Sequence, residues 1–231
     1  MDEEPSFTPG LFAFLRELAA NNDRAWFAAN KDRYEAEVKE PALAFVEDVA
    51  HRFPQSCPAF VADARPTGGS MFRIHRDTRF AKDKTPYKTH VGLRFRHRDG
   101  REVPAPVYYL HLEPGNVFVG AGCFHPDPAL LRAIRDRMLT KPEAWTAAVG
   151  DPAFAERFRL GGSSLKRAPA GVPADHPLIE DLKRKDVAAF AQLTEADALA
   201  PGFLDVFDEL CRTAAPFVRF LCDSARVPYE V

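Results

Sequence analysis

Apolar and polar residues alternate with a period of two through the middle of the chain. The alternation runs through four segments, at residues 70–76, 90–97, 106–112 and 116–123. Turn-forming residues separate the later segments, at Asp99-Gly100 and at Pro114-Gly115-Asn116. Successive side chains of a strand point to opposite faces of a sheet, so this pattern predicts an antiparallel meander with one apolar face.

Helical periodicity flanks this central part on both sides. Before it, helices are predicted at residues 9–20 and from Asn22 or Asp23 to 53, with Pro41 as a kink or a new start. After it, helices are predicted at 127–138, 142–148, 152–158 and 176–185, two more within 203–226 that meet near Pro216, and a further strand at 187–193. We therefore predict an α+β fold, an antiparallel sheet of about four to six strands with N- and C-terminal helices packed on it.

Composition adds little to this picture except the nature of the core. There are 19 Phe against five Tyr and two Trp, which predicts a core built around phenylalanine. No internal repeat and no long linker divides the chain, so we expect residues 1–231 to form one globular domain.

The sequence also carries expectations about location. Residues 1–10 are acidic and lack the basic start and apolar run of a signal peptide, and no stretch approaches the ~18 apolar residues of a membrane span. The four Cys are scattered without a C-x-x-C pair. A cytoplasmic protein without a membrane partner is expected.

Charge is distributed unevenly along the chain. The formal net charge is −2, but residues 73–101 contain ten Lys or Arg against three Asp or Glu. A basic segment in an otherwise acidic protein favours a local anion site over a surface that tracks a nucleic acid. The sequence pI near 6.4 favours the same interpretation, because nucleic-acid-binding domains are commonly far more basic.

The basic side chains concentrate in a polar loop between two predicted strands. The candidate ligand-binding residues there are Arg73, Arg76, Arg79, Lys82, Lys84, Tyr87 and Lys88. Arginine offers a planar fork for phosphate or carboxylate, and lysine a mobile point charge. The alternative is that these cations pair with acidic groups and only stabilise the fold.

Further candidates lie on the predicted sheet. If Phe72, Ile74, Val91, Leu93 and Phe95 face the core, the opposite face carries Arg73, His75, Arg94, Arg96, Tyr109, His111, Gly120 and Gly122. The two glycines would let a ligand approach the backbone. The alternative is that helices cover this face.

Signals for catalysis are weak. Candidate proton-transfer residues are His75, His90, His111 and Asp77, but each is more often an ordinary hydrogen-bonded residue. The seven His show no metal-binding spacing, so no metal site is predicted. Gly120-x-Gly122 before a helix and the loop that contains Lys166 are weak anion-binding signals.

Several motifs in this order resemble one family. They are residues 76–80 (RDTRF), 83–88 (DKTPYK), 108–115 (YYLHLEPG), 120–122 (GAG), 165–169 (LKRAP) and 175–177 (DHP). Together they resemble the bacterial and fungal family called domain of unknown function 2461, over roughly residues 7–226. Ala81, where a Ser is expected, and Cys123-Phe124, where an aromatic pair or Trp is usual, depart from the pattern. The resemblance implies no activity.

Three interpretations of the basic segment 73–90 therefore stay open. The first is a pocket or enzyme site for a small phosphate- or carboxylate-bearing ligand, and the second is a nucleic-acid or protein interaction module without catalysis. The third is a buried salt-bridge lattice among Arg76, Asp77, Arg79 and Asp83. We favour the first; the sequence indicates no particular cofactor, reaction or oligomeric state.

Overall fold

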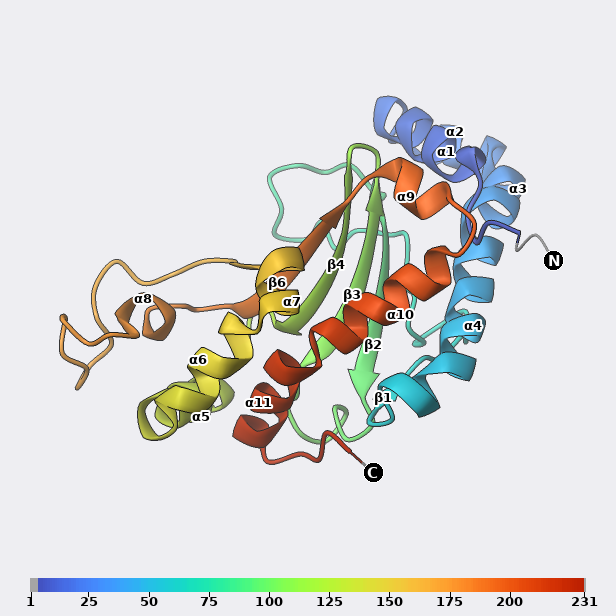
Figure 1. The fold of residues 1–231 in the computed structure, drawn as a ribbon. Helices are drawn as coiled ribbons and strands as arrows, with labels where there is room; N and C mark the ends of the chain where they lie inside the picture. Colours follow the sequence, from blue (N-terminus) through green and yellow to red (C-terminus); the bar gives the residue numbers. More distant parts are fainter. Residues whose placement is uncertain (1–3, 231) are drawn as a thin grey trace.

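Six antiparallel strands form a single sheet in the computed structural model, which describes residues 4–230 (Figure 1). The order across the sheet is β1-β2-β3-β4-β6-β5. The strands are β1 (Phe60–Val61), β2 (Val91–His97), β3 (Val107–Glu113), β4 (Asn116–Cys123), β5 (Arg159–Gly161) and β6 (Val187–Leu193). The predicted α+β class and the antiparallel sheet are confirmed.

The register of the central strands decides which side chains are neighbours. Arg94 of β2 pairs with Tyr109 of β3, and Tyr109 pairs in turn with Gly120 of β4. Paired residues of adjacent strands project to the same face. An arginine, a tyrosine and a glycine therefore lie in one row on the face that the sequence analysis assigned to them.

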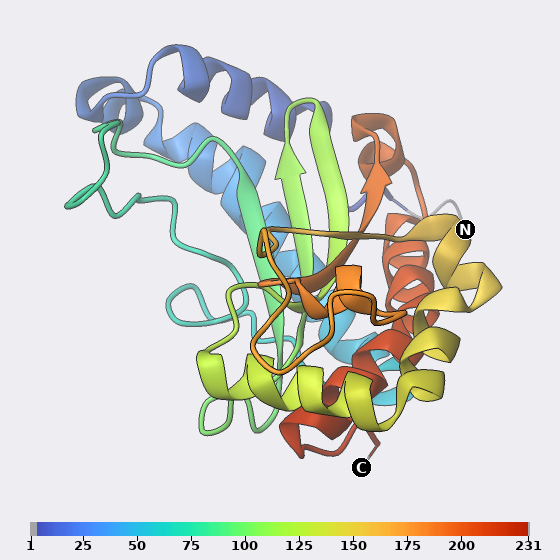
Figure 2. The ribbon, with the colours of Figure 1, turned by 90° about the vertical axis from the view of Figure 1, so that its left-hand side faces the viewer.

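Helices flank the sheet, and several of them cover its opposite, apolar face. The N-terminal ones are α1 (Pro9–Ala20), α2 (Arg24–Ala29), α3 (Lys31–Tyr34), the π-helical η1 (Glu35–Lys39) and α4 (Glu40–Ser56). The later ones are α5 (Pro128–Thr140), α6 (Pro142–Gly150), α7 (Pro152–Arg157), α8 (Ile179–Leu182), α9 (Glu195–Leu199), α10 (Phe203–Thr213) and α11 (Ala215–Ala225). Helix α4 packs on β1 and β2, while α10 and α11 pack on β4. Figure 2 shows α10 and α11 on one side of the sheet and the loop near residue 80 on the other.

Phenylalanine fills the space between the helices and the sheet, as predicted. Phe53 of α4 packs edge-on against Phe95 of β2, with ring centroids 5.3 Å apart, and Phe207 of α10 lies 5.2 Å from Phe95. All three rings are buried. Fully burying a side chain of this size contributes roughly 1.5–3 kcal/mol, so these contacts hold the two terminal helical segments on the sheet.

The predicted strand at residues 70–76 is wrong. Only isolated bridges occur there, Met71 with Leu93 and His75 with Tyr87. The chain leaves the edge of β2 after Phe72, whose N–H still donates to the Gly92 carbonyl at 2.9 Å, and the Phe72 ring lies over the open face against Tyr109 and Arg94 rather than in the core. Gly92 of β2 permits this position, because a Cβ there would lie 2.9 Å from the Phe72 ring.

The predicted helix at residues 176–185 is shorter than expected. Only α8 is helical, because His176 accepts a hydrogen bond at Nδ1 from the Leu178 N–H and forms a turn instead. None of the helices at residues 4–230 combines the length and apolar character that a bilayer crossing requires.

Candidate functional site

The open face of the sheet contains a cavity of about 600 Å³, which we call the open-face cavity. Strands β2, β3, β4 and β6 form its floor, and the segment after β4 forms one rim. Its polar and aromatic lining consists of Phe72, Arg94, Arg96, His97, Tyr109, His111, Phe118, Phe124, His125, Asp127 and Phe190. The volume lies within the range of about 300–1,000 Å³ that is usual for small-molecule sites.

Glycines let aromatic rings lie flat against the floor of this cavity. A Cβ on Gly92 would lie 2.5 Å from the Tyr109 hydroxyl. Phe190 of β6 lies against Gly161, where an added Cβ would come within 2.8 Å of its ring, and against Gly120 at ordinary contact distance. The glycines at these positions therefore make room for aromatic side chains.

Two arginines supply positive charge to the cavity. Arg94 and Arg96 are half-buried on β2, and among residues 4–230 neither forms a salt bridge with a carboxylate. The Arg94 guanidinium lies 5.1 Å from the centroid of the Phe72 ring. Burial, together with the charge of Arg96, lowers the pKa of Arg94 below its usual value. Neither guanidinium thus has a carboxylate partner among these residues, although the Asp127 carboxylate also lines the cavity.

A row of hydrogen-bonded side chains runs along β3 at one end of the cavity. The Tyr109 hydroxyl lies 3.1 Å from His111 Nδ1, and His111 Nε2 lies 3.2 Å from Glu113 Oε2. The three residues are two positions apart and share one face of the strand. With its proton on Nε2, His111 donates to Glu113 and accepts from Tyr109, so the row connects a half-buried phenol to a carboxylate.

Burial shifts the ionisation of this row. Burial lowers the pKa of His111, although the hydrogen bond to Glu113 opposes the shift. Burial and the charge of Glu113 raise the pKa of Tyr109 to about 12. For Glu113, burial raises the pKa, but hydrogen bonds from Asn116 and His111 make the net shift downward. Near neutral pH the row holds a carboxylate, a neutral imidazole and a protonated phenol.

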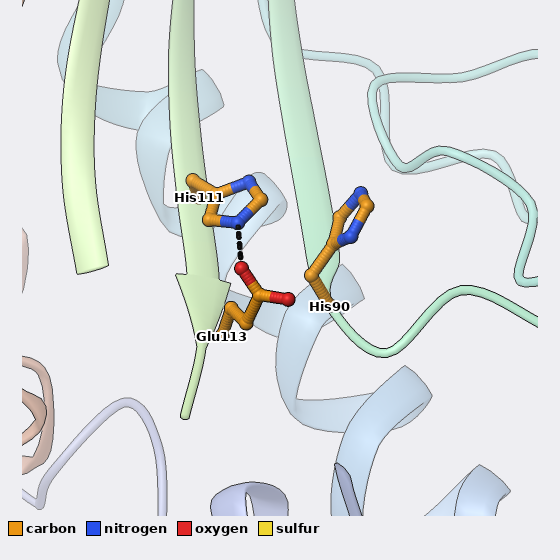
Figure 3. A group of neighbouring side chains, drawn as sticks. All are labelled: His90, His111 and Glu113. Atoms are coloured by element: carbon orange, nitrogen blue, oxygen red, sulfur yellow. Dashed lines mark hydrogen bonds and ion pairs between the residues drawn. The ribbon is translucent and has the colours of Figure 1, made fainter. Parts of the chain in front are cut away.

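A second imidazole stands beside this row. His90 immediately precedes β2, and its ring centroid lies 4.5 Å from that of His111 (Figure 3). Burial, His111 and Lys88 lower the pKa of His90 to about 4, so this ring is neutral as well. Among residues 4–230, one group of His, Cys, Asp or Glu side chains has metal-ligand proximity, and it consists of His90, His111 and Glu113.

The rim of the cavity contains a backbone outlier. His125 has a φ of 51°, in the left-handed region that residues other than glycine rarely adopt. Asp186 holds it there, because its Oδ1 accepts from the His125 N–H at 2.8 Å and lies 3.1 Å from His125 Nδ1. Such outliers cluster at ligand sites.

Several charges of the basic loop pair with one another. Arg76 pairs with Asp83 at 2.5 Å and Arg79 with Asp77 at 2.7 Å. These are the pairs of the proposed lattice, but they are not buried: the side chains of Arg79 and Asp83 are 77% and 60% exposed. Lys84 binds the carbonyl of Thr78. Exposed pairs of this kind contribute little to stability.

The structure therefore divides the predicted site residues among different places. Arg94, His111, Gly120 and Gly122 line the open-face cavity. Arg76, Tyr87, Lys88 and His90 line a smaller cavity of about 380 Å³ beside α1. Neither cavity includes the remaining predicted residues, which are Arg73, His75, Asp77, Arg79, Lys82, Lys84 and Lys166.

Sequence reasoning missed three residues of this region. Glu113 follows His111 by two positions, directly after the predicted strand 106–112, and continuing that strand by one residue places both side chains on one face. That signal was available in the sequence. For His125 and Phe190, no local pattern indicates that they meet at one cavity, because β4 and β6 are far apart in the chain.

An antiparallel sheet with helices on one face and a ligand-sized cavity on the other defines an α+β protein with its candidate site on the open face of the sheet. The chain belongs to the family described as "Conserved hypothetical protein (DUF2461)", whose family model matches residues 10–220. No curated protein and no solved structure matches the chain.

Proposed function

We propose that the protein binds a small organic molecule with an anionic group and a flat apolar part, in the open-face cavity. The observation that carries the proposal is a pair of arginines without carboxylate partners in an aromatic-walled cavity of about 600 Å³. A carboxylate or phosphate on the ligand would supply the missing negative charge. Arg94 and Arg96 offer planar donor forks for either group.

The aromatic walls support the second part of the proposal. Phe118 and Phe190 line the cavity together with Phe72. Aromatic faces favour flat, apolar ligands by stacking and by burial of apolar surface. The Tyr109 hydroxyl, which stays protonated near neutral pH, adds a polar group to the cavity wall. For an enzyme, the same row of Tyr109, His111 and Glu113 would carry the proton transfers.

The arginine pair gives the direct test. Phenyl phosphate and benzoate, with inorganic phosphate for comparison, are titrated into the protein and followed by thermal shift and calorimetry. We expect saturable stabilisation of wild type, about 2.7 kcal/mol at a hundred times Kd. The Arg94→Ala/Arg96→Ala variant is expected to lose at least about tenfold in affinity, since a hydrogen bond to a charged group contributes about 1.5–3 kcal/mol.

The control for this test is Arg79→Ala, because Arg79 is exposed in the basic loop and lines neither cavity. Its affinity should equal that of wild type. Absence of any anion-dependent shift in wild type, or equal losses in Arg79→Ala and the cavity variant, contradicts the proposal.

One observation favours the second candidate, a nucleic-acid or protein interaction module. The loop tip presents Phe80 with 96% of its surface exposed, next to Arg79 and close to Lys82. The Arg79 guanidinium lies 5.9 Å from the Phe80 ring centroid. An exposed aromatic ring between cations is suited to stacking on an unpaired base.

Gel-shift titrations with single-stranded DNA and RNA separate the two candidates. For a cavity that binds small molecules we expect weak binding of the nucleic acid and no effect of Phe80→Ala on it. The dependence of the affinity on salt concentration should then correspond to about one or two phosphate contacts. Micromolar binding with a steep salt slope, weakened by about 1–3 kcal/mol in Phe80→Ala, would favour the interaction module.

A further inference from the structure

Two strand ends bring His90, His111 and Glu113 together. Val91 of β2 pairs with Leu112 of β3, and Gly92 pairs with His111. His90 therefore stands beside the end of β3 where Glu113 lies. Gly92 has no side chain to separate the imidazoles, whose centroids are 4.5 Å apart. The Glu113 carboxylate points toward the space between the two rings (Figure 3).

We propose that His90, His111 and Glu113 bind one divalent transition-metal ion. One donor atom from each lies within 4.8 Å of the other two. His111 Nε2 and Glu113 Oε2 are already 3.2 Å apart, close to the roughly 3.4 Å between neighbouring donors of a tetrahedral ion with bonds of about 2.1 Å. Only His90 must move closer, by no more than about 1.4 Å, the difference between 4.8 Å and this donor spacing.

The donor set indicates the class of ion. Two imidazoles and one carboxylate suit first-row transition metals such as zinc, iron or cobalt, whereas Ca²⁺ and Mg²⁺ prefer oxygen donors. Three protein donors leave at least one position for water or a ligand, as in catalytic rather than structural sites. His90 lines the smaller cavity and His111 the open-face cavity, so that position is reachable from outside.

Neighbouring groups already orient the donors. The Tyr109 hydroxyl contacts His111 Nδ1 at 3.1 Å, which leaves Nε2 for an ion when the proton resides on Nδ1. Asn116 Nδ2 donates to Glu113 Oε2 at 3.1 Å and fixes the carboxylate. Such outer partners hold ligands in place in metal sites. The ammonium group of Lys88, whose charge acts on His90, donates a hydrogen bond to the Arg73 carbonyl at 2.6 Å.

His90 supports the same inference. Its half-buried imidazole forms no hydrogen bond within residues 4–230, although a carboxylate and a second imidazole stand beside it. The ion would give this ring a partner. It would also replace the His111–Glu113 hydrogen bond: the neutral His111 ring then carries its one proton on Nδ1, toward the Tyr109 hydroxyl, and Nε2 binds the ion without net proton release.

Cobalt titration of the chelator-treated full chain tests the site directly. Wild type is expected to bind one Co²⁺ per chain, with visible absorption bands of low-symmetry coordination, and Zn²⁺ should displace it in calorimetry. Glu113→Gln and His90→Ala should each weaken binding by more than about 100-fold. Tyr109→Phe, which removes an outer partner, should cost about 10- to 100-fold. His75→Ala, in the exposed loop, is the matched control and should bind as wild type does.

If a His111→Ala variant fails to fold, the Glu113→Gln and His90→Ala variants still test the site. Glu113→Gln conserves shape and His90 is only half-buried, so circular dichroism is expected to match wild type for both. Failure of wild type to bind Co²⁺ or Zn²⁺ overturns the inference, and so does unchanged affinity in these two folded variants. Because the metal alone is the probe, the result does not depend on the ligand proposed for the open-face cavity.

Discussion

Replacing Asp186 with alanine is expected to lower the free energy of unfolding by about 3–5 kcal/mol. Asp186 is 1% exposed, and its carboxylate accepts from the Ser163 N–H at 2.8 Å, the Ser163 hydroxyl at 2.6 Å and the His125 N–H at 2.8 Å. Alanine leaves these donors without their acceptor. It also releases two segments at once, the left-handed His125 at the cavity rim and the loop that begins at Gly162.

Chemical denaturation of wild type and variant measures this loss. Asp77→Ala is the matched control, because Asp77 is an exposed aspartate whose ion pair with Arg79 is also exposed. Surface substitutions of this kind usually change stability by no more than about 0.5 kcal/mol. A loss below about 1 kcal/mol in Asp186→Ala would mean that these hydrogen bonds do not hold the rim.

The same carboxylate gives stability a defined dependence on pH. Burial raises the pKa of Asp186, but hydrogen bonds from Ser163 and His125 make the net shift downward. A carboxyl with a lowered pKa in the folded state contributes stability above its unfolded pKa, about 3.9, and loses it as the pH falls through the folded value. The stability difference between wild type and Asp186→Asn should therefore shrink below about pH 4.

The sheet was predictable because its information is local. Apolar residues at every second position of β2, β3 and β4 face the helices, and the turn at Gly115 has the positive φ that its glycine predicts. The same pattern failed at residues 70–76. Alternation there is too short to distinguish a strand from a segment that touches β2 at Met71 and Phe72 and then leaves it. The Phe72 side chain consequently lies on the open face of the sheet and not in the core.

The site was predictable only in part, for a related reason. Arg94 and His111 were assigned to the open face by their parity along the strands, and both line the cavity. In the basic loop, part of the positive charge is paired locally: Asp77 forms an ion pair with Arg79, and Asp83 with Arg76. A sum of charges along the sequence does not show such pairing. The meeting of His90 with Glu113 depends on the β2–β3 register, which no local pattern contains.

Gly122 and Gly120 provide the last contrast between sequence and structure. The sequence suggested that both let a ligand approach the backbone. In the fold, Gly122 has a φ of 116°, and a Cβ there would clash with the carbonyl oxygen of Val187 on the neighbouring strand β6. At Gly120 an added Cβ would lie 3.5 Å from the Phe190 ring and 3.7 Å from the Tyr109 Cβ, both ordinary contact distances. Gly122 is therefore required by the close approach of β4 and β6, whereas Gly120 has room for a methyl group.

Gly122→Ala is accordingly expected to lose about 3 kcal/mol or more in the free energy of unfolding, from backbone strain and from overlap with a strand that cannot move independently. Gly120→Ala should lose less than about 1 kcal/mol and still fold, with a slightly narrower cavity. Denaturation of the two variants side by side gives the comparison. Equal losses at both positions would contradict the register of β4 against β6. A Gly120→Ala protein that folds but binds phenyl phosphate more weakly than wild type would place the ligand over β4. The added methyl group lies on the floor of the open-face cavity, so it would affect only a ligand bound there.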